Sequence, residues 1–118
     1  MTPTPTQPSM RTCITLLFAV LALQSTSRLR LLDPADSFFT EAAAPLTRIR
    51  LDTTAGVIVI DVHRAWAPRG ADRFVNLVRA GFYNGATVFR IRPGTWAQFG
   101  IPADPAVAQT WRSQTFPD

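Results

Sequence analysis

The strongest constraint on the fold of this chain is a run of β-branched and apolar residues over positions 57–62, which reads Val-Ile-Val-Ile-Asp-Val. β-Branched side chains pack well in strands, and successive side chains of a strand point to opposite faces. Because apolar residues occupy both faces here, the run predicts a β-strand that is covered on both sides.

The residues before this run predict its pairing partner. Arg48–Thr53 alternate polar and apolar side chains, which is the period of a half-buried strand. Thr54-Ala55-Gly56 then supplies a short turn that contains a glycine. Two strand-like segments joined in this way predict an antiparallel hairpin.

A capping helix is predicted over Pro68–Ala80, where apolar residues recur at helical spacing. Pro68 suits the first helical position, because its missing N–H is not needed there. Gly81 suits the left-handed residue that commonly follows the last turn of a helix. The predicted apolar stripe of this helix consists of Ala71, Phe74, Leu77 and Val78.

Shorter elements are predicted around the hairpin and the helix. Residues 28–47 form a linker or a short helix, in which Asp33 would be the N-cap of a helix over residues 35–44. Thr87–Ile91 predicts a third strand and Ala97–Gly100 the start of a fourth, and residues 101–118 resemble a loop. A hairpin, a helix and further strands favour a mainly β fold with α-helices over a parallel βαβ sheet.

Residues 1–27 have the order of a secretory signal peptide. Arg11 precedes the uncharged segment Cys13–Leu23, and small and polar residues follow it. At about 1.5 Å per residue the segment spans about 16 Å, too short for a hydrocarbon core of roughly 30 Å. We therefore expect export to the periplasm or another extracytoplasmic space, cleavage after Ser25 or Ser27, and no membrane span afterwards. A buried helix and an uncleaved membrane anchor are the alternatives, and Met10 is an alternative start.

The inventory of reactive groups is small. Cys13 is the only cysteine and His63 the only histidine, so the sequence offers no internal disulfide and no metal-binding cluster. Glycine-rich phosphate-binding patterns are absent. All 12 basic residues are arginines spread from Arg11 to Arg112, whereas a nucleic-acid surface would cluster them. We expect no cofactor, no metal and no nucleic-acid partner, and an activity that works by binding and electrostatics.

Four blocks of the sequence occur in an order that resembles the cyclophilin-type peptidyl-prolyl isomerases. The first is the hairpin segment over residues 51–62, and the second is the Ala-Pro pair at 67–68. The third, residues 74–85, reads F-V-N-L-V-R-A-G-F-Y-N-G, and the fourth, residues 88–100, reads V-F-R-I-R-P-G-T-W-A-Q-F-G. The resemblance covers about Arg48 to Arg112.

This resemblance implies a closed antiparallel β-barrel of eight strands capped by two helices. Residues 48–118 would form its N-terminal half, with about four strands and one helix, so the chain resembles a truncated domain. The implied activity is cis–trans isomerisation of X–Pro peptide bonds in proline-containing polypeptides by a monomer that assists the folding of exported proteins. The implied catalytic residues are Arg90 and Gln98.

The resemblance also implies substrate-binding positions at Phe89, Thr95 and Trp96. Phe89 stands where many members of the family have histidine. Thr95 and Trp96 replace a phenylalanine and a methionine that line the family's proline pocket. These replacements leave two alternatives to an active isomerase: a non-catalytic module that binds proline peptides, and an inactive truncated fragment.

Overall fold

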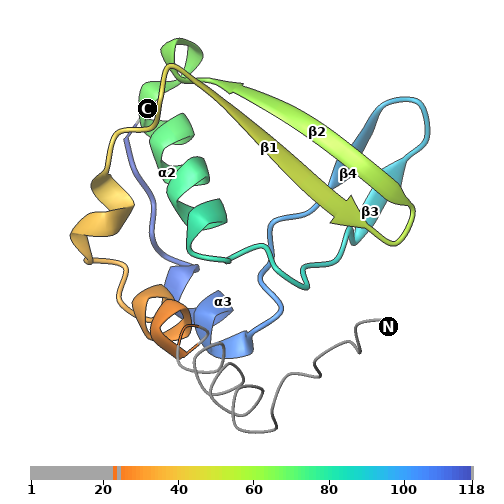
Figure 1. Cartoon of the computed structure of the whole chain (residues 1–118). Helices are drawn as coiled ribbons and strands as arrows, with labels where there is room; N and C mark the ends of the chain where they lie inside the picture. The colour runs from red at the N-terminus through yellow and green to blue at the C-terminus, as the bar shows by residue number, and fades with distance from the viewer. Residues whose placement is uncertain (1–22, 24, 118) are drawn as a thin grey trace, which may run out of the picture.

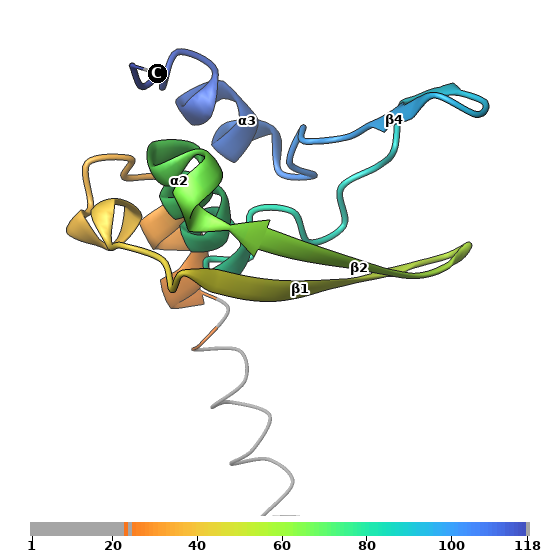
Figure 2. The same cartoon turned by 90° about the horizontal axis from the view of Figure 1, so that it is seen from above.

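Two antiparallel hairpins extend as separate arms from a helical end of the molecule (Figures 1 and 2). The computed structural model describes Leu23 and residues 25–117, so most of the predicted signal peptide lies outside the described residues. No described helix combines the length and the apolar character that a membrane crossing requires. Residues 25–31 are helical, and the elements that follow are η1 (Ser37–Thr40), β1 (Leu46–Thr53), β2 (Gly56–His63), η2 (Arg64–Trp66), α2 (Pro68–Arg79), β3 (Arg90–Arg92), β4 (Trp96–Gln98) and α3 (Pro105–Trp111), where η marks a 3-10 helix.

The hydrophobic core lies at the helical end and joins three segments that are distant in sequence. The ring of Trp111 packs edge-to-face on Phe39 and Phe82, with centroids 4.8 and 5.8 Å away. Its Nε1 donates a hydrogen bond of 2.7 Å to the Leu31 carbonyl. Aromatic pairs in this geometry contribute about 0.5–1.5 kcal/mol beyond their burial. α3 is thereby fixed to helix α2 and to the N-terminal segment, in a cluster of Leu31, Phe39, Leu77, Ala80, Phe82, Val107 and Trp111.

Helix α2 confirms the helix predicted after the first hairpin and ends one residue earlier than predicted. Gly81 has a φ of 81°, the left-handed conformation that glycine adopts without strain. The Phe82 N–H donates to the Leu77 carbonyl and the Gly81 N–H to the Val78 carbonyl, each at 3.0 Å. This pair of hydrogen bonds is a Schellman motif, and Phe82 and Leu77 supply its hydrophobic contact.

The prediction of a loop over residues 101–118 is wrong, because α3 begins at Pro105. The Asp104 carboxylate accepts from the N–H groups of Ala106 and Val107, at 2.9 and 3.5 Å, and Pro105 occupies the first helical turn. This is an ordinary N-cap arrangement. Burial of Trp111 then stabilises a helix that is too short to persist by its own propensity.

The linker or short helix predicted for residues 28–47 contains a 3-10 helix at Ser37–Thr40, shorter than the helix expected to run as far as Ala44. Asp36, three residues after Asp33, is the N-cap of η1, and its carboxylate accepts from the Phe38 N–H at 2.8 Å. The chain is extended again at Glu41. The reason is tertiary, because η1 places Phe39 in the core cluster, where it is 3% exposed.

The first hairpin has the predicted strands and turn. β1 and β2 pair over their full lengths, from Leu46 opposite His63 to Thr53 opposite Gly56. Arg48 lies opposite Asp61, and its Nε and Nη2 donate to the two carboxylate oxygens at 2.7 and 2.8 Å. This ion pair lies on the same face of the hairpin as Val57 and Val59, which are opposite Asp52 and Arg50.

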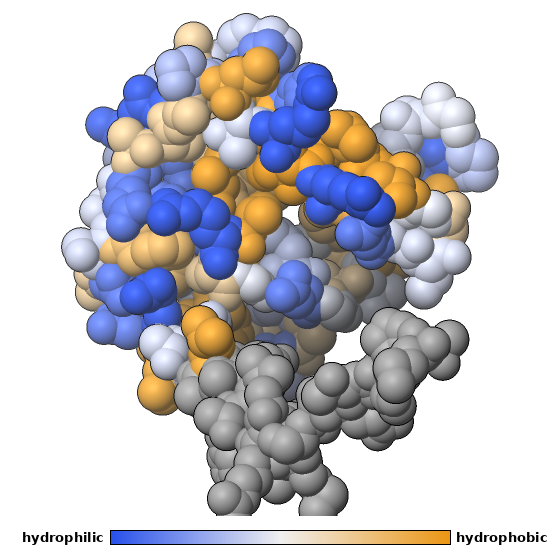
Figure 3. All heavy atoms as spheres, viewed as in Figure 1, coloured by the Kyte–Doolittle hydropathy of each residue, from blue (hydrophilic) through white to orange (hydrophobic). Residues whose placement is uncertain are grey.

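The prediction that β2 is covered on both sides is wrong for the described part of the chain. Val57, Ile58 and Val59 are 54%, 50% and 56% exposed. Figure 3 shows apolar surface along this arm, interrupted by hydrophilic side chains. The hairpin is a two-stranded sheet, and its tip projects away from the helices, so no second layer covers it there (Figure 2).

The predicted half of a closed barrel is likewise not formed by the described residues. Their strands make two separate two-stranded antiparallel sheets, β1–β2 and β3–β4. The observed architecture is mixed helix and strand. The reason is that no backbone pairing joins the two hairpins, and a barrel requires a continuous ladder.

The apolar stripe predicted for α2 is correct at Ala71 and Leu77 only. Phe74 and Val78 are half-buried, whereas Val75 and Asn76 are buried. Asn76 is 0% exposed, and its Nδ2 donates to the Glu41 carbonyl at 2.8 Å. Its Oδ1 accepts from Arg79 at 3.0 Å. α2 is thus packed on a second side, against the segment after η1, which the periodicity of α2 alone does not reveal.

Asn76→Ala should lower the free energy of unfolding by about 1–3 kcal/mol, because the Glu41 carbonyl loses its buried donor. Urea unfolding followed by tryptophan fluorescence measures this loss. The control is Gln109→Ala on the exposed side of α3, which should change stability by less than about 0.5 kcal/mol. Equal stability of the two variants would contradict the structural role of Asn76.

A second link joins α2 to both neighbouring segments through Asp72. Its carboxylate accepts from Arg64 Nε and Nη2, at 2.7 and 2.9 Å, and from the Ala43 N–H at 2.8 Å. The hydrogen bonds from Arg64, more than the bond from Ala43, hold the pKa of Asp72 below its ordinary value.

A lowered pKa makes the ionised carboxylate stabilise the folded state above the unfolded pKa of about 3.9, and this stabilisation disappears as the pH falls through the folded pKa. The free energy of unfolding should therefore decrease on acidification below about pH 4. Asp72→Asn should be less stable at pH 7 and should show a shallower acid dependence. Asp52→Asn, at an exposed carboxylate of β1, is the control and should keep the wild-type slope. Identical slopes for wild type and Asp72→Asn in urea titrations at pH 7 to 2 would refute this role.

Candidate functional site

The hairpin β3–β4 carries all the residues that the sequence assigns to a site. Its turn is formed by Pro93 and Gly94, and the Thr95 N–H donates to the Arg92 carbonyl at 3.0 Å. Gly94 has a φ of 69°. Proline followed by a glycine with positive φ is the pattern of a type II turn. The Pro93-Gly94 pair therefore accounts for the turn that connects the two strands of this short hairpin.

Arg90 and Gln98, the predicted catalytic pair, lie directly opposite each other in this hairpin. The N–H of Phe89 donates to the Gln98 carbonyl at 3.1 Å, which fixes the open end of the ladder. Residues that face each other across an antiparallel pair have their side chains on the same face. The structure thus brings the two predicted catalytic side chains together.

Trp96 lies on the same face and contacts the arginine. The Arg90 guanidinium carbon is 5.1 Å from the centroid of the Trp96 ring, in the geometry of a cation–π contact. Trp96 is the diagonal neighbour of Arg90, because Gln98 is the direct partner and lies two residues further along β4. The indole therefore restricts where the guanidinium can lie while leaving it exposed to solvent.

Thr95 and Phe89 are placed at opposite ends of the hairpin. Thr95 is the last residue of the turn, and Phe89 precedes β3 and is about half exposed. Neither residue contributes a side-chain contact to the Arg90–Trp96 pair among the ring and charge contacts of the described residues. The structure therefore joins Arg90, Gln98 and Trp96, and does not join the other two predicted positions to them.

Arg92 belongs to this face and was missed by the sequence analysis. It lies opposite Trp96, and it is two residues from Arg90, so both arginines point to one side of β3. The signal that would have found it is the strand period of two, applied outward from Arg90. We refer to Arg90, Arg92, Trp96 and Gln98 as the hairpin face.

Within the described part of the chain, the hairpin face has no carboxylate partner. Among the described residues, none of the ion pairs involves Arg90 or Arg92. The segment over residues 86–101 contains both arginines and no acidic residue. Both side chains are exposed. The face is therefore positively charged and solvent-accessible, with an aromatic ring beside the charges.

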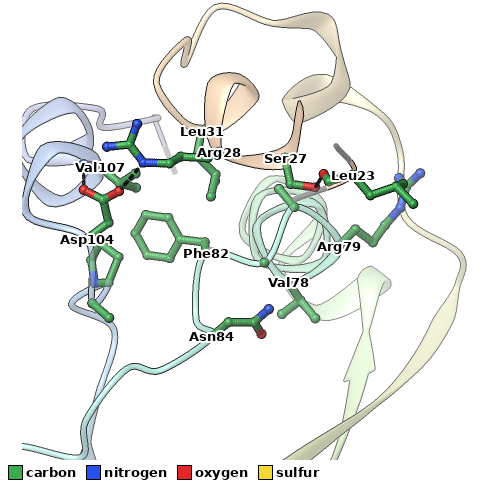
Figure 4. Close-up of a pocket in the computed structure, with 14 residues that line it drawn as sticks. Leu23, Ser27, Arg28, Leu31, Val78, Arg79, Phe82, Asn84, Asp104 and Val107 are labelled. Carbon is green, nitrogen blue, oxygen red and sulfur yellow. Dashed lines mark hydrogen bonds and ion pairs between the residues drawn. The ribbon is translucent and has the colours of Figure 1, made fainter. Parts of the chain in front are cut away.

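Two cavities lie elsewhere, at the helical end. The larger has a volume of about 540 Å³ and lies between the helix at residues 25–31, the end of α2 and the start of α3, where Arg28 and Asp104 form an ion pair of 2.7 Å (Figure 4). The smaller, of about 330 Å³, lies between α2, Tyr83 and the C-terminal segment. Neither is lined by residues of the hairpin face. In the described part of the chain no three His, Cys, Asp or Glu side chains gather as metal ligands.

Two further tryptophans lie outside the hairpin face. Trp111 belongs to the core cluster. Trp66 is 81% exposed and stacks on His63 with the ring centroids 4.2 Å apart. Trp66 therefore packs on His63, outside the core cluster.

The sequence matches several relatives over about half of its length. It is 36% identical over 56 residues to a "Peptidyl-prolyl cis-trans isomerase-like 1" of Gibberella zeae, which covers 48% of this chain and 35% of that protein. It is 39% identical over 59 residues to "Peptidyl-prolyl cis-trans isomerase A" of Dickeya dadantii, covering 50% and 31% of the two chains. The corresponding mouse isomerase-like 1 protein is 37% identical over 54 residues, covering 46% and 32%.

The matched part of the chain thus spans about a third of the length of each of these relatives. No solved structure matches the chain significantly. The family model described as "Cyclophilin type peptidyl-prolyl cis-trans isomerase/CLD" matches residues 48–118, which is more than half of the chain and includes α2 and the hairpin face. The chain belongs to the cyclophilin-type peptidyl-prolyl cis-trans isomerase family.

Proposed function

We propose that this protein catalyses cis–trans isomerisation of X–Pro peptide bonds, with Arg90, Trp96 and Gln98 of the hairpin face as its site. The observation that carries the proposal is the direct cross-strand pairing of Arg90 with Gln98 inside the region that matches the family. The two side chains share one face, are exposed to solvent and have no other charged partner among the described residues.

The reaction needs no nucleophile and no metal. Resonance makes the peptide bond planar, with a rotation barrier of about 18–20 kcal/mol, and an X–Pro bond isomerises over tens to hundreds of seconds unaided. In the twisted transition state this resonance is lost, and the prolyl nitrogen regains a lone pair that can accept a hydrogen bond. A group that donates to this nitrogen only in the twisted state lowers the barrier selectively.

Arg90 is suited to this donation. A guanidinium stays charged at all physiological pH values and presents planar N–H donors. The contact with Trp96 limits its positions, which reduces the reorganisation that the transition state requires. Gln98, opposite Arg90, has an amide that can both donate to and accept from the substrate backbone.

The remaining predicted positions would contact the prolyl ring and its neighbours. Trp96 offers an apolar surface next to the guanidinium. Phe89 is exposed and apolar at the open end of the hairpin, and Thr95 is exposed at the turn. The reaction requires that the prolyl ring be held in place while the carbonyl group before it rotates. Apolar side chains beside the guanidinium would hold the ring.

Arg90→Ala should reduce the catalysed exchange rate by a factor on the order of 10², the usual cost of removing one transition-state donor. Arg90→Lys should recover only part of the rate, because an ammonium keeps the charge and loses the planar donor pair. Magnetisation-exchange NMR on a short peptide with one X–Pro bond measures the rate directly. Arg50→Ala, at an exposed arginine on the other hairpin, is the matched control and should retain the wild-type rate.

Two outcomes would count against catalysis by Arg90. Peptide binding without any acceleration by the wild-type chain would identify a non-catalytic proline-peptide module. Equal acceleration by wild type and Arg90→Ala, with unchanged circular dichroism, would assign the activity to other residues.

We also propose that residues 1–27 direct export. The support is the order of Arg11, the uncharged segment Cys13–Leu23 and the small residues after it. Expression in a bacterial host should place the mature chain in the periplasmic fraction, and N-terminal sequencing should begin at Thr26 or Arg28. Both cleavage positions would retain Leu31, which the core requires. An intact N-terminus in the cytoplasmic fraction would overturn the proposal.

A further inference from the structure

Arg92 is the charged residue of the hairpin face that has no role in the proposed isomerisation mechanism. It lies opposite Trp96, on the side of β3 that also carries Arg90. Side chains two residues apart on a strand are separated by about 7 Å along the chain. The two guanidinium groups repel each other at this spacing, and no acidic residue of the segment over residues 86–101 compensates them.

We propose that Arg92 makes the site selective for substrates with an acidic side chain next to the proline, so that Glu–Pro and Asp–Pro bonds are preferred. This inference rests on the proposed isomerase function and names its substrate class. If Arg90 acts at the prolyl nitrogen, Arg92 lies about two strand residues away along the same face. In a substrate peptide, the carboxylate of a glutamate or aspartate next to the proline can reach across this distance of about 7 Å.

The charge pattern favours an anion over a neutral side chain. A carboxylate beside Arg92 would form a charge-assisted hydrogen bond and would relieve the repulsion between the two arginines. Trp96, which lies opposite Arg92 and contacts Arg90, gives the same face an apolar surface for the prolyl ring. The face therefore presents an anion-binding group directly opposite a ring-binding group.

The expected preference is modest, because the site is exposed. Exposed ion pairs change an equilibrium or a rate by about 2- to 5-fold. The full chain should therefore accelerate exchange of Ala-Glu-Pro-Phe about 2- to 5-fold more than exchange of Ala-Gln-Pro-Phe, and Ala-Lys-Pro-Phe should be the poorest of the three. In 1 M NaCl, where the Debye length is about 3 Å, the three peptides should converge.

Arg92→Gln isolates the residue, since it removes the charge and leaves a polar side chain on the strand. It should abolish the Glu-to-Gln preference while retaining exchange of the glutamine peptide. Arg50→Gln makes the same change of net charge on β1 and should retain the preference. Circular dichroism verifies that both variants are folded.

The outcomes separate this inference from the function on which it rests. Absence of acceleration for all three peptides rejects the isomerase, and the ratio of the dissociation constants, measured by NMR titration of the amides of residues 89–98, then decides the preference. Acceleration with equal rates for the glutamate and glutamine peptides keeps the isomerase and overturns the role of Arg92. A single-stranded oligonucleotide that displaces the peptides, together with equal peptide rates, would assign the charges to nucleic acid and also overturn it.

Discussion

The described structure depends most on the contacts of one side chain, Trp111. Its Nε1 donates to the Leu31 carbonyl at 2.7 Å, and its ring packs edge-to-face on Phe39 and Phe82. These contacts join α3, η1, the helix at residues 25–31 and the end of α2, which are distant from one another in sequence. A buried indole whose N–H has a partner combines large apolar burial with a directional bond, so the helical end has a defined arrangement.

The hairpins do not depend on this core in the same way. Cross-strand pairing and local turns hold β1–β2 and β3–β4, and several apolar side chains of both arms remain exposed, among them Val57, Val59 and Ile91. A two-stranded sheet is marginal unless another layer covers it.

The sequence predicted the elements whose cause is local. Gly81 ends α2 where expected, because a left-handed glycine closes the Schellman motif. The alternation of Arg48–Thr53 and the β-branched run after it gave the correct hairpin. Arg90 and Gln98 were proposed from the family resemblance instead, and the register of the second hairpin places them directly opposite each other. The same alternation, applied to Arg92, would have completed the candidate site.

Sequence alone determined the first hairpin, α2 and the family, because turn residues, strand period and helix caps act over a few positions, whereas the strands predicted at Thr87–Ile91 and from Ala97 lie at Arg90–Arg92 and Trp96–Gln98. Only the tertiary structure decided where the short helices begin, because α3 and η1 are stabilised by burial of Trp111 and Phe39 rather than by their own propensity. It also decided that Asn76 is buried, since its partner, the Glu41 carbonyl, is 35 residues away in sequence. The contact of Arg90 with Trp96 has the same origin: the pairing register, and not the order of residues, brings the guanidinium onto the ring.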